Sequence, residues 1–264
     1  MRYCRYLDMH GSHYGNVEEV DGRLMVTQMM APWPEDPYAT WSRSAPFTPF
    51  PLEEATLLAP VVPGKIVCVG RNYKDHASEL GNEIPKEPLL FFKPISSVIA
   101  SGAEIKLPPA SLTERVDFEG ELAVVIFRRC RNLTEQDDVR NYIRGYTIVN
   151  DVTARDLQKK DGQWTRAKGF DTFCPMGPIV SDELDPWAGV ELATRLNGEE
   201  KQRGNTRQFI FDISAVIRYI SQFMTLEPGD TIPTGTPSGV APMKSGDTVE
   251  VEIDGLGVLR STVA

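Results

Sequence analysis

The sequence predicts a mainly β fold with a few helices. From residue 61 onward, short apolar segments of strand length alternate with turn residues. Two of the connections contain Asn197-Gly198 and Asp254-Gly255, dipeptides that favour tight hairpin turns. One longer segment has clear helical spacing of its apolar residues. These three observations together favour a strand-dominated chain.

The N-terminal part differs from the rest of the chain in its sequence pattern. Short alternating runs are followed by a proline-rich passage over residues 31–52. Proline lacks a backbone donor, so regular ladders are not expected to persist there. We therefore predict a small β-rich N-terminal portion with a proline-rich linker, residues 1–58, and a larger domain, residues 59–264.

Strands of the larger domain are expected where apolar and β-branched runs end at turn residues. These segments are residues 64–70, 88–94, 117–127, 146–152, 190–200 and 247–259. A helix is expected after Asp212, because apolar residues recur at helical spacing from Ile213 to Phe223. Weaker helical patterns cover residues 73–80 and 135–144.

Composition and charge limit the function. The formal net charge is -9, and no basic stripe appears, which argues against binding to nucleic acid or to an anionic membrane. The longest apolar runs are too short to span a bilayer, so a cytoplasmic protein is expected. The four cysteines form no C-x-x-C pair, which favours reduced thiols over disulfides or a zinc site.

Three carboxylates form a candidate metal site. Glu119 and Glu121 are two residues apart in a predicted strand and therefore project from one face, while Asp151 ends the predicted strand YTIVN. Spacing alone also fits an ordinary solvated acidic face. The run LAVVIF that follows Glu121 is apolar at both parities, as in a strand buried on both faces, so the acidic pair needs a counter-charge. An all-oxygen site of this kind favours Mg²⁺ or Mn²⁺, with Ca²⁺ as a further alternative.

Five motifs follow one another from about residue 63 to the C-terminus: VGRNYKDHASELG, VDFEGELAVVI, VNDVTARDLQ, WTRAKGFDTFCPMGP and TGTPSGV. In this order and at these separations, they resemble the signatures of the fumarylacetoacetate hydrolase family. The resemblance implies a mixed β-roll, a homodimer, and metal binding by Glu119, Glu121 and Asp151. It also implies a small 2-oxo acid as the substrate of a metal-dependent catalytic domain.

The resemblance assigns catalytic roles to three further residues. His76 and Glu79 share a helix face if residues 73–80 are helical, and together they would activate water. From spacing alone the pair also fits a surface ion pair. Lys168 would stabilise negative charge on a substrate oxygen, although outside its motif a solvated lysine is the ordinary interpretation.

Substrate-binding candidates lie in the same motifs. Gln158 and Thr236 match family positions that contact the substrate. The TGTPSG loop could alternatively be an ordinary tight turn. Arg71 follows a predicted strand and could bind a carboxylate, with Tyr73 beside it.

The function expected first is metal-dependent hydrolysis of a C–C bond in a 2,4-dioxo acid of the acylpyruvate or fumarylpyruvate type, because the His76–Glu79 pair is present. The alternatives are 2-hydroxyhepta-2,4-diene-1,7-dioate isomerisation and oxaloacetate-type decarboxylation at the same site. An inactive, metal-stabilised carboxylate-binding module is the alternative from a different class.

Overall fold

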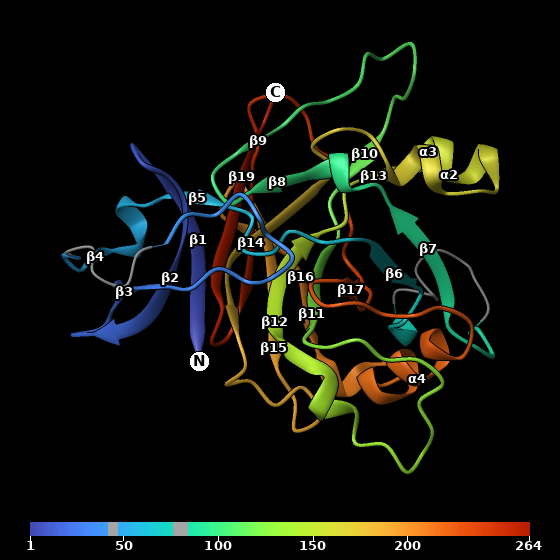
Figure 1. The fold of residues 1–264 in the computed structure, drawn as a ribbon. Coiled ribbons are helices and arrows are strands. Elements are labelled where there is room, and N and C mark those ends of the chain that lie inside the picture. The colour runs from blue at the N-terminus through green and yellow to red at the C-terminus, as the bar shows by residue number, and fades with distance from the viewer. Residues whose placement is uncertain (42–46, 76–83) are drawn as a thin grey trace.

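The computed structural model describes residues 1–41, 47–75 and 84–264. Its largest sheet runs across the molecule (Figure 1). In spatial order its strands are β4 (Phe50–Pro51), β3 (Arg23–Met30), β2 (Gly11–Val20), β1 (Arg2–Asp8), β14 (Cys174–Ser181), β12 (Ile143–Asn150), β11 (Gly120–Ile126), β17 (Thr231–Pro233), β6 (Ile66–Gly70) and β7 (Leu89–Lys93), while β5 (Thr56–Leu58) pairs with β1 and β8 (Val98–Ala100) with β14.

A second sheet packs against this one. Its strands, in spatial order, are β16 (Glu199–Asn205), β15 (Glu191–Leu196), β18 (Thr248–Ile253), β19 (Gly257–Val263) and β9 (Glu104–Ile105). A short ladder joins β10 (Val116–Asp117) to β13 (Thr153–Ala154). The described helices are α2 (Arg155–Asp161), α3 (Thr165–Lys168) and α4 (Ile213–Phe223), with 3₁₀ turns η1 (Leu52–Glu54), η2 (Ile95–Ser97), η3 (Val139–Tyr142) and η4 (Thr206–Gln208).

The mainly β prediction is confirmed. Each of the six predicted strand segments overlaps a strand, and both predicted hairpin turns connect antiparallel neighbours. No helix within the described ranges has the length and apolar character needed to cross a membrane.

The N-terminal strands belong to the largest sheet, since β1 pairs with β14. In Figure 1 they form one side of the molecule, and α2 and α3 lie at the other. A buried cation also joins the two parts: Arg144 of β12 forms an ion pair with Glu35 and lies 4.0 Å from the centre of the Trp33 ring. The boundary near residue 58 stays a prediction, while the sheet itself is continuous across it.

The helix predictions had mixed outcomes. The helix from Ile213 to Phe223 is confirmed as α4, and its apolar face is buried in the main core. The helix predicted over residues 135–144 is wrong, because only the 3₁₀ turn η3 forms there, after Asp138 accepts a hydrogen bond from the backbone of Arg140. The helix predicted over 73–80 lies largely outside the described residues.

The register of β11 and β12 brings the acidic residues together. Gly120 pairs with Asn150 in this antiparallel ladder, so the next pair along is Glu119 with Asp151. The Asp151 N–H donates to the Glu119 carbonyl at 2.8 Å. Residues thirty-two positions apart in the sequence are therefore fixed as neighbours by backbone pairing.

We predict that Asp212→Ala lowers the free energy of unfolding by about 1 kcal/mol. The Asp212 side chain accepts a hydrogen bond from the Ala215 N–H at 2.8 Å, and alanine would leave that donor without its cap. Urea unfolding measures the change. Asp212→Asn keeps a capping oxygen and serves as the control; equal losses in both variants would contradict a capping role.

Candidate active site

Three buried carboxylates converge at one point. One oxygen each from Glu119, Glu121 and Asp151 can be chosen so that all three lie within 4.8 Å of one another. The three residues are 4%, 2% and 0% exposed. Because like charges repel strongly when water is excluded, this arrangement requires cations close by.

Two buried lysines hold Asp151 from opposite oxygens. Lys93 Nζ donates to Asp151 Oδ1 at 2.7 Å, and Lys168 Nζ donates to Oδ2 at 2.6 Å. Lys168 also donates to Glu119 Oε2 at 2.9 Å. One ammonium thus bridges two of the three carboxylates.

The two lysines differ in how many of their N–H groups are left for a ligand. An ammonium has three N–H groups. Lys93 donates its other two to backbone carbonyls, those of Val152 at 3.2 Å and Lys168 at 2.5 Å, and it is not among the described residues that line the cavity in front of the carboxylates. Lys168 makes two side-chain contacts and lines a cavity, so its third N–H is available to a ligand.

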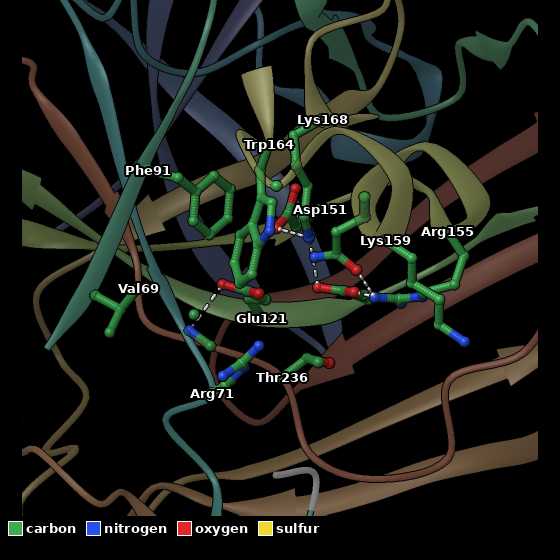
Figure 2. Close-up of a pocket in the computed structure, with 15 residues that line it drawn as sticks. Val69, Arg71, Phe91, Glu121, Asp151, Arg155, Lys159, Trp164, Lys168 and Thr236 are labelled. Atoms are coloured by element: carbon green, nitrogen blue, oxygen red, sulfur yellow. Dashed lines mark hydrogen bonds and ion pairs between the residues drawn. The ribbon is translucent and has the colours of Figure 1, made fainter. Parts of the chain in front are cut away.

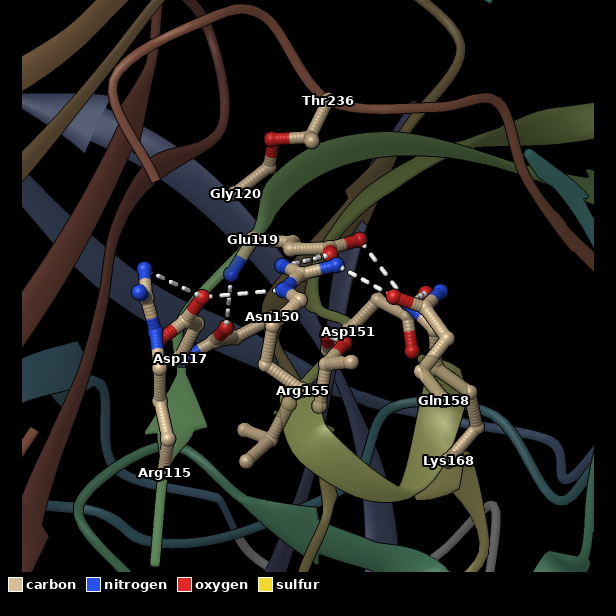
Figure 3. A network of polar contacts seen from close by, with 12 residues as sticks. Arg115, Asp117, Glu119, Gly120, Asn150, Asp151, Arg155, Gln158, Lys168 and Thr236 are labelled. Carbon is tan, nitrogen blue, oxygen red and sulfur yellow. Dashed lines mark hydrogen bonds and ion pairs between the residues drawn. The ribbon is translucent and has the colours of Figure 1, made fainter. Parts of the chain in front are cut away.

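Arg155 neutralises the far side of Glu119. Its Nη2 donates to Glu119 Oε1 at 2.5 Å and its Nε to Asp117 Oδ2 at 2.9 Å, while Nη1 donates to Gln158 Oε1 at 2.7 Å (Figure 3). Arg115 also donates to Asp117, from Nε to Oδ1 and from Nη2 to Oδ2. The guanidinium is therefore engaged on all three nitrogens and acts as a fixed brace.

Of the three carboxylates, Glu121 has the fewest positive groups near it, among the described residues, to balance a negative charge. Its Oε2 accepts the Gly235 N–H at 2.8 Å, and it forms no ion pair with any residue of the described ranges. Burial, and then the charges of Asp151 and Glu119, raise the pKa of Glu121 well above its ordinary value. A buried carboxylate in this condition, with two others within reach, has the chemistry of a ligand for a hard divalent cation.

Lys168 remains charged despite its burial. Burial alone lowers the pKa of its ammonium, but the Asp151 and Glu119 carboxylates outweigh that effect and the pKa is raised overall. Its Nζ also lies 5.0 Å from the centre of the Phe91 ring. The cavity therefore contains a fixed positive charge beside the carboxylates.

The cavity in front of the carboxylates has a volume of about 330 Å³. Its walls include the predicted substrate-binding residues Arg71, Gln158 and Thr236. In Figure 2 Arg71 lies on the side of the cavity opposite Lys168, and the rings of Phe91 and Trp164 form another wall. The volume suits a small organic acid.

Arg71 is held in an uncommon backbone conformation. Its φ is 57°, in the left-handed region that non-glycine residues rarely occupy. The next residue, Asn72, is fully buried and bonds through its side chain to the backbone of Phe211 and Thr234. This clamp fixes the turn that presents Arg71 to the cavity, and backbone strain of this kind is common at functional sites.

Tyr73 and Thr236 have packing or hydrogen-bonding roles of their own in the structure. Tyr73 does not line the cavity; it is 3% exposed and packs edge-on against Phe209, with ring centres 5.1 Å apart. Thr236 lines the cavity, but its hydroxyl donates to the Gly120 carbonyl at 2.8 Å. His76 and Glu79 lie outside the described residues.

Sequence reasoning missed Lys93 and Arg155. Lys93 follows the apolar run LLFF, where a lysine ordinarily marks the solvated end of a strand. Arg155 lies four residues after Asp151, and its signal was its place in the motif VNDVTARD. Only the packing of β7 against α3 shows that Lys93 is buried against Asp151.

Comparison with protein families identifies the chain. A family model described as "Fumarylacetoacetate (FAA) hydrolase C-terminal" matches residues 65–264. The chain belongs to the fumarylacetoacetate hydrolase family, whose members are enzymes. The predicted family is thereby confirmed.

Several relatives are similar over most of the chain. An uncharacterized protein of Methanocaldococcus jannaschii is 52% identical, over 77% of this chain and 84% of the relative. The human mitochondrial protein named oxaloacetate tautomerase is 43% identical, over 81% of this chain and 71% of its own length. The crystal structure of 2-hydroxyhepta-2,4-diene-1,7-dioate isomerase from Mycobacterium marinum has a TM-score of 0.85 at 42% identity, over 100% of this chain and 98% of that chain.

We predict that Lys93→Met lowers the free energy of unfolding by about 3 to 5 kcal/mol, because it removes one partner of a buried ion pair and leaves Asp151 under-compensated. Urea unfolding of metal-free protein measures the change. Lys159→Met is the matched control: Lys159 is exposed, and its replacement is expected to shift stability by less than about 0.5 kcal/mol. Equal effects of the two substitutions would contradict the role given to Lys93.

Proposed function

We propose that this enzyme promotes proton transfer on a small 2-oxo acid, by stabilising its enolate, with the help of a divalent cation held by Glu119, Glu121 and Asp151. The single observation that carries the proposal is the buried Glu121, which has no ion-pair partner among the described residues and lies beside two carboxylates that already have theirs. A bound cation would supply the missing charge.

The donor set favours Mg²⁺ or Mn²⁺, because all three ligands are carboxylate oxygens, and Ca²⁺ is a further candidate. When bound, the cation would supply Lewis acidity to the oxygens of a 2-oxo acid and lower the free energy of its enolate. The fit rests on buried oxygens that converge and on a Glu121 carboxyl group that forms no ion pair with the described residues.

Lys168 is the residue best suited to touch the reacting oxygen. Its third N–H is available on the cavity side, and its charge is fixed in place by Glu119 and Asp151. A preorganised donor of this kind stabilises an oxyanion as it develops. Arg71 is suited to bind a substrate carboxylate, and the Gln158 amide nitrogen can donate to the substrate because the amide oxygen already accepts from Arg155.

Proton transfer is proposed first because the described part of the cavity provides charge stabilisation for an enolate, which is what this reaction needs. Two similar proteins, the human oxaloacetate tautomerase and the mycobacterial isomerase, bear names that describe this class of reaction. Hydrolysis of a 2,4-dioxo acid is the second candidate, favoured by the H-x-x-E pair of the sequence and the family's name. Decarboxylation of an oxaloacetate-like acid would use the same enolate stabilisation.

We predict that Asp151→Ala abolishes both Mn²⁺ binding and turnover, because it removes one of three ligands and frees two buried lysines of their partner. Calorimetry with Mn²⁺ measures binding. Acylpyruvates, fumarylpyruvate, oxaloacetate and a hydroxydienedioate, each followed by product analysis, measure turnover. Asp171→Ala, at an exposed acidic position, is the matched control and should bind Mn²⁺ as the wild type does. Wild-type protein that binds Mn²⁺ but converts none of these acids would support an inactive binding module instead.

We predict that His76→Ala separates hydrolysis from proton transfer. If His76 activates water, its loss should reduce C–C hydrolysis by about two to four orders of magnitude. Keto–enol exchange of oxaloacetate needs no water nucleophile and should fall much less. Both rates are measured on the same Mn²⁺-loaded protein. Equal losses in the two reactions would show that His76 serves a step common to both, and a wild type without hydrolase activity would remove the second candidate.

A further inference from the structure

Gly120, the residue between the two glutamates, lies against the second sheet with no room for a side chain. A Cβ atom at this position would lie 2.2 Å from Thr194 Oγ1 and 2.9 Å from Val251 Cγ1. The second sheet can therefore hold this residue only through its backbone N–H and carbonyl groups.

Those two groups face away from β12 at a place where strand pairing has ended. On that side of β11 the neighbour is β17, which pairs with Ala123 to Val125 and whose hydrogen bonding extends to Leu122 through Thr234. Gly120 lies beyond that range. Its N–H and carbonyl would be buried without partners unless side chains supplied them.

Gln202 of β16 supplies one partner and organises the other. Its Oε1 accepts the Gly120 N–H at 3.0 Å, while its Nε2 donates to Thr236 Oγ1 at 2.7 Å and to the Pro237 carbonyl at 2.8 Å. The Thr236 hydroxyl in turn donates to the Gly120 carbonyl at 2.8 Å. Figure 3 shows these two residues side by side. Gln202 and Thr236 are 1% and 2% exposed.

One amide thus joins three parts of the site. It fixes the backbone between Glu119 and Glu121, and it fixes the loop whose Gly235 N–H binds Glu121. The orientation of the Thr236 hydroxyl is also determined, because a hydroxyl that receives the Gln202 N–H must direct its own hydrogen elsewhere, here to Gly120.

We propose that Gln202 is a positioning residue for the carboxylate cluster: from the second sheet it sets the separation and direction of Glu119 and Glu121 and holds the Thr234–Gly239 loop against them. The inference rests on the proposed cation site and adds to it a residue that does not line the cavity. Its consequence is that cation affinity depends on a side chain outside the ligand set, as is common for groups that orient metal ligands.

The test compares Gln202→Met with Thr194→Val. Methionine has a similar shape but can neither accept from Gly120 nor donate to Thr236, so we expect the Kd for Mn²⁺ to rise by about 10- to 100-fold. Thr194 is fully buried in the same sheet and faces Gly120, but its hydroxyl has no hydrogen-bond partner within the described residues, so the control should bind Mn²⁺ like the wild type. Calorimetry gives Kd and stoichiometry, and thermal melts of metal-free protein give Tm.

These readouts separate positioning from general support of the fold. A merely structural role for Gln202 would lower Tm and the fraction of protein that binds Mn²⁺ while leaving Kd unchanged, and that result would overturn the inference. Should Gln202→Met not fold, Gln202→Asn, whose amide is one methylene too short to reach all its partners, is expected to show the same rise in Kd. A wild type that binds no Mn²⁺ would overturn the cation site and this inference together; a wild type and a folded Gln202 variant that bind equally well would overturn this inference alone.

Discussion

The burial of three carboxylates within 4.8 Å of one another is the constraint on which the rest of the structure depends. Inside a protein their mutual repulsion is several times stronger than in water, so the cluster persists only where charges of opposite sign are fixed around it. Lys93, Lys168 and Arg155 provide three such charges, each from a different segment. Strand β7 and helix α3 are thereby tied to Asp151 at the end of β12, and helix α2 is tied to Glu119 just before the start of β11.

The N–H groups that remain unused distinguish a cation that supports the carboxylates from one that can also bind a ligand. Lys93 donates all three of its N–H groups to protein oxygens, and Arg155 donates from all three of its nitrogens. Lys93 therefore retains no N–H for a ligand, whereas the Arg155 guanidinium is held in place by carboxylate and amide oxygens on every nitrogen. Lys168 touches the same carboxylates and keeps one direction open toward the cavity. Identical side chains at one site thus take different roles because their surroundings use up different numbers of donors.

The sequence predicts the fold class and the convergence of Glu119, Glu121 and Lys168 far better than it predicts their support. Strand alternation and the glycine turns determine the hairpins, and α4 shows its apolar face in its spacing. The short helices α2 and α3 are largely polar and carry no such period. Gln202 illustrates the remaining difficulty: its inward parity with Gly204 is visible along β16, but its partners come from residues that are distant in sequence.

The arrangement also explains why one carboxylate cluster is compatible with several reactions of 2-oxo acids. The charges around Glu119 and Asp151 are balanced by the protein itself, so that wall of the cavity does not depend on what the substrate carries at its far end. Arg71, on the opposite side, lies 5.8 Å from the centre of the Trp164 ring, and both residues come from other segments of the chain. Under the proposed function, these two residues would contact the far end of the substrate. Under the proposed function, enolate stabilisation would belong to the first wall, whereas the choice of proton, water or carbon dioxide as the moving group would depend on the residues beside the other end of the substrate. Reaction type can therefore change within this fold without any change in the carboxylate cluster.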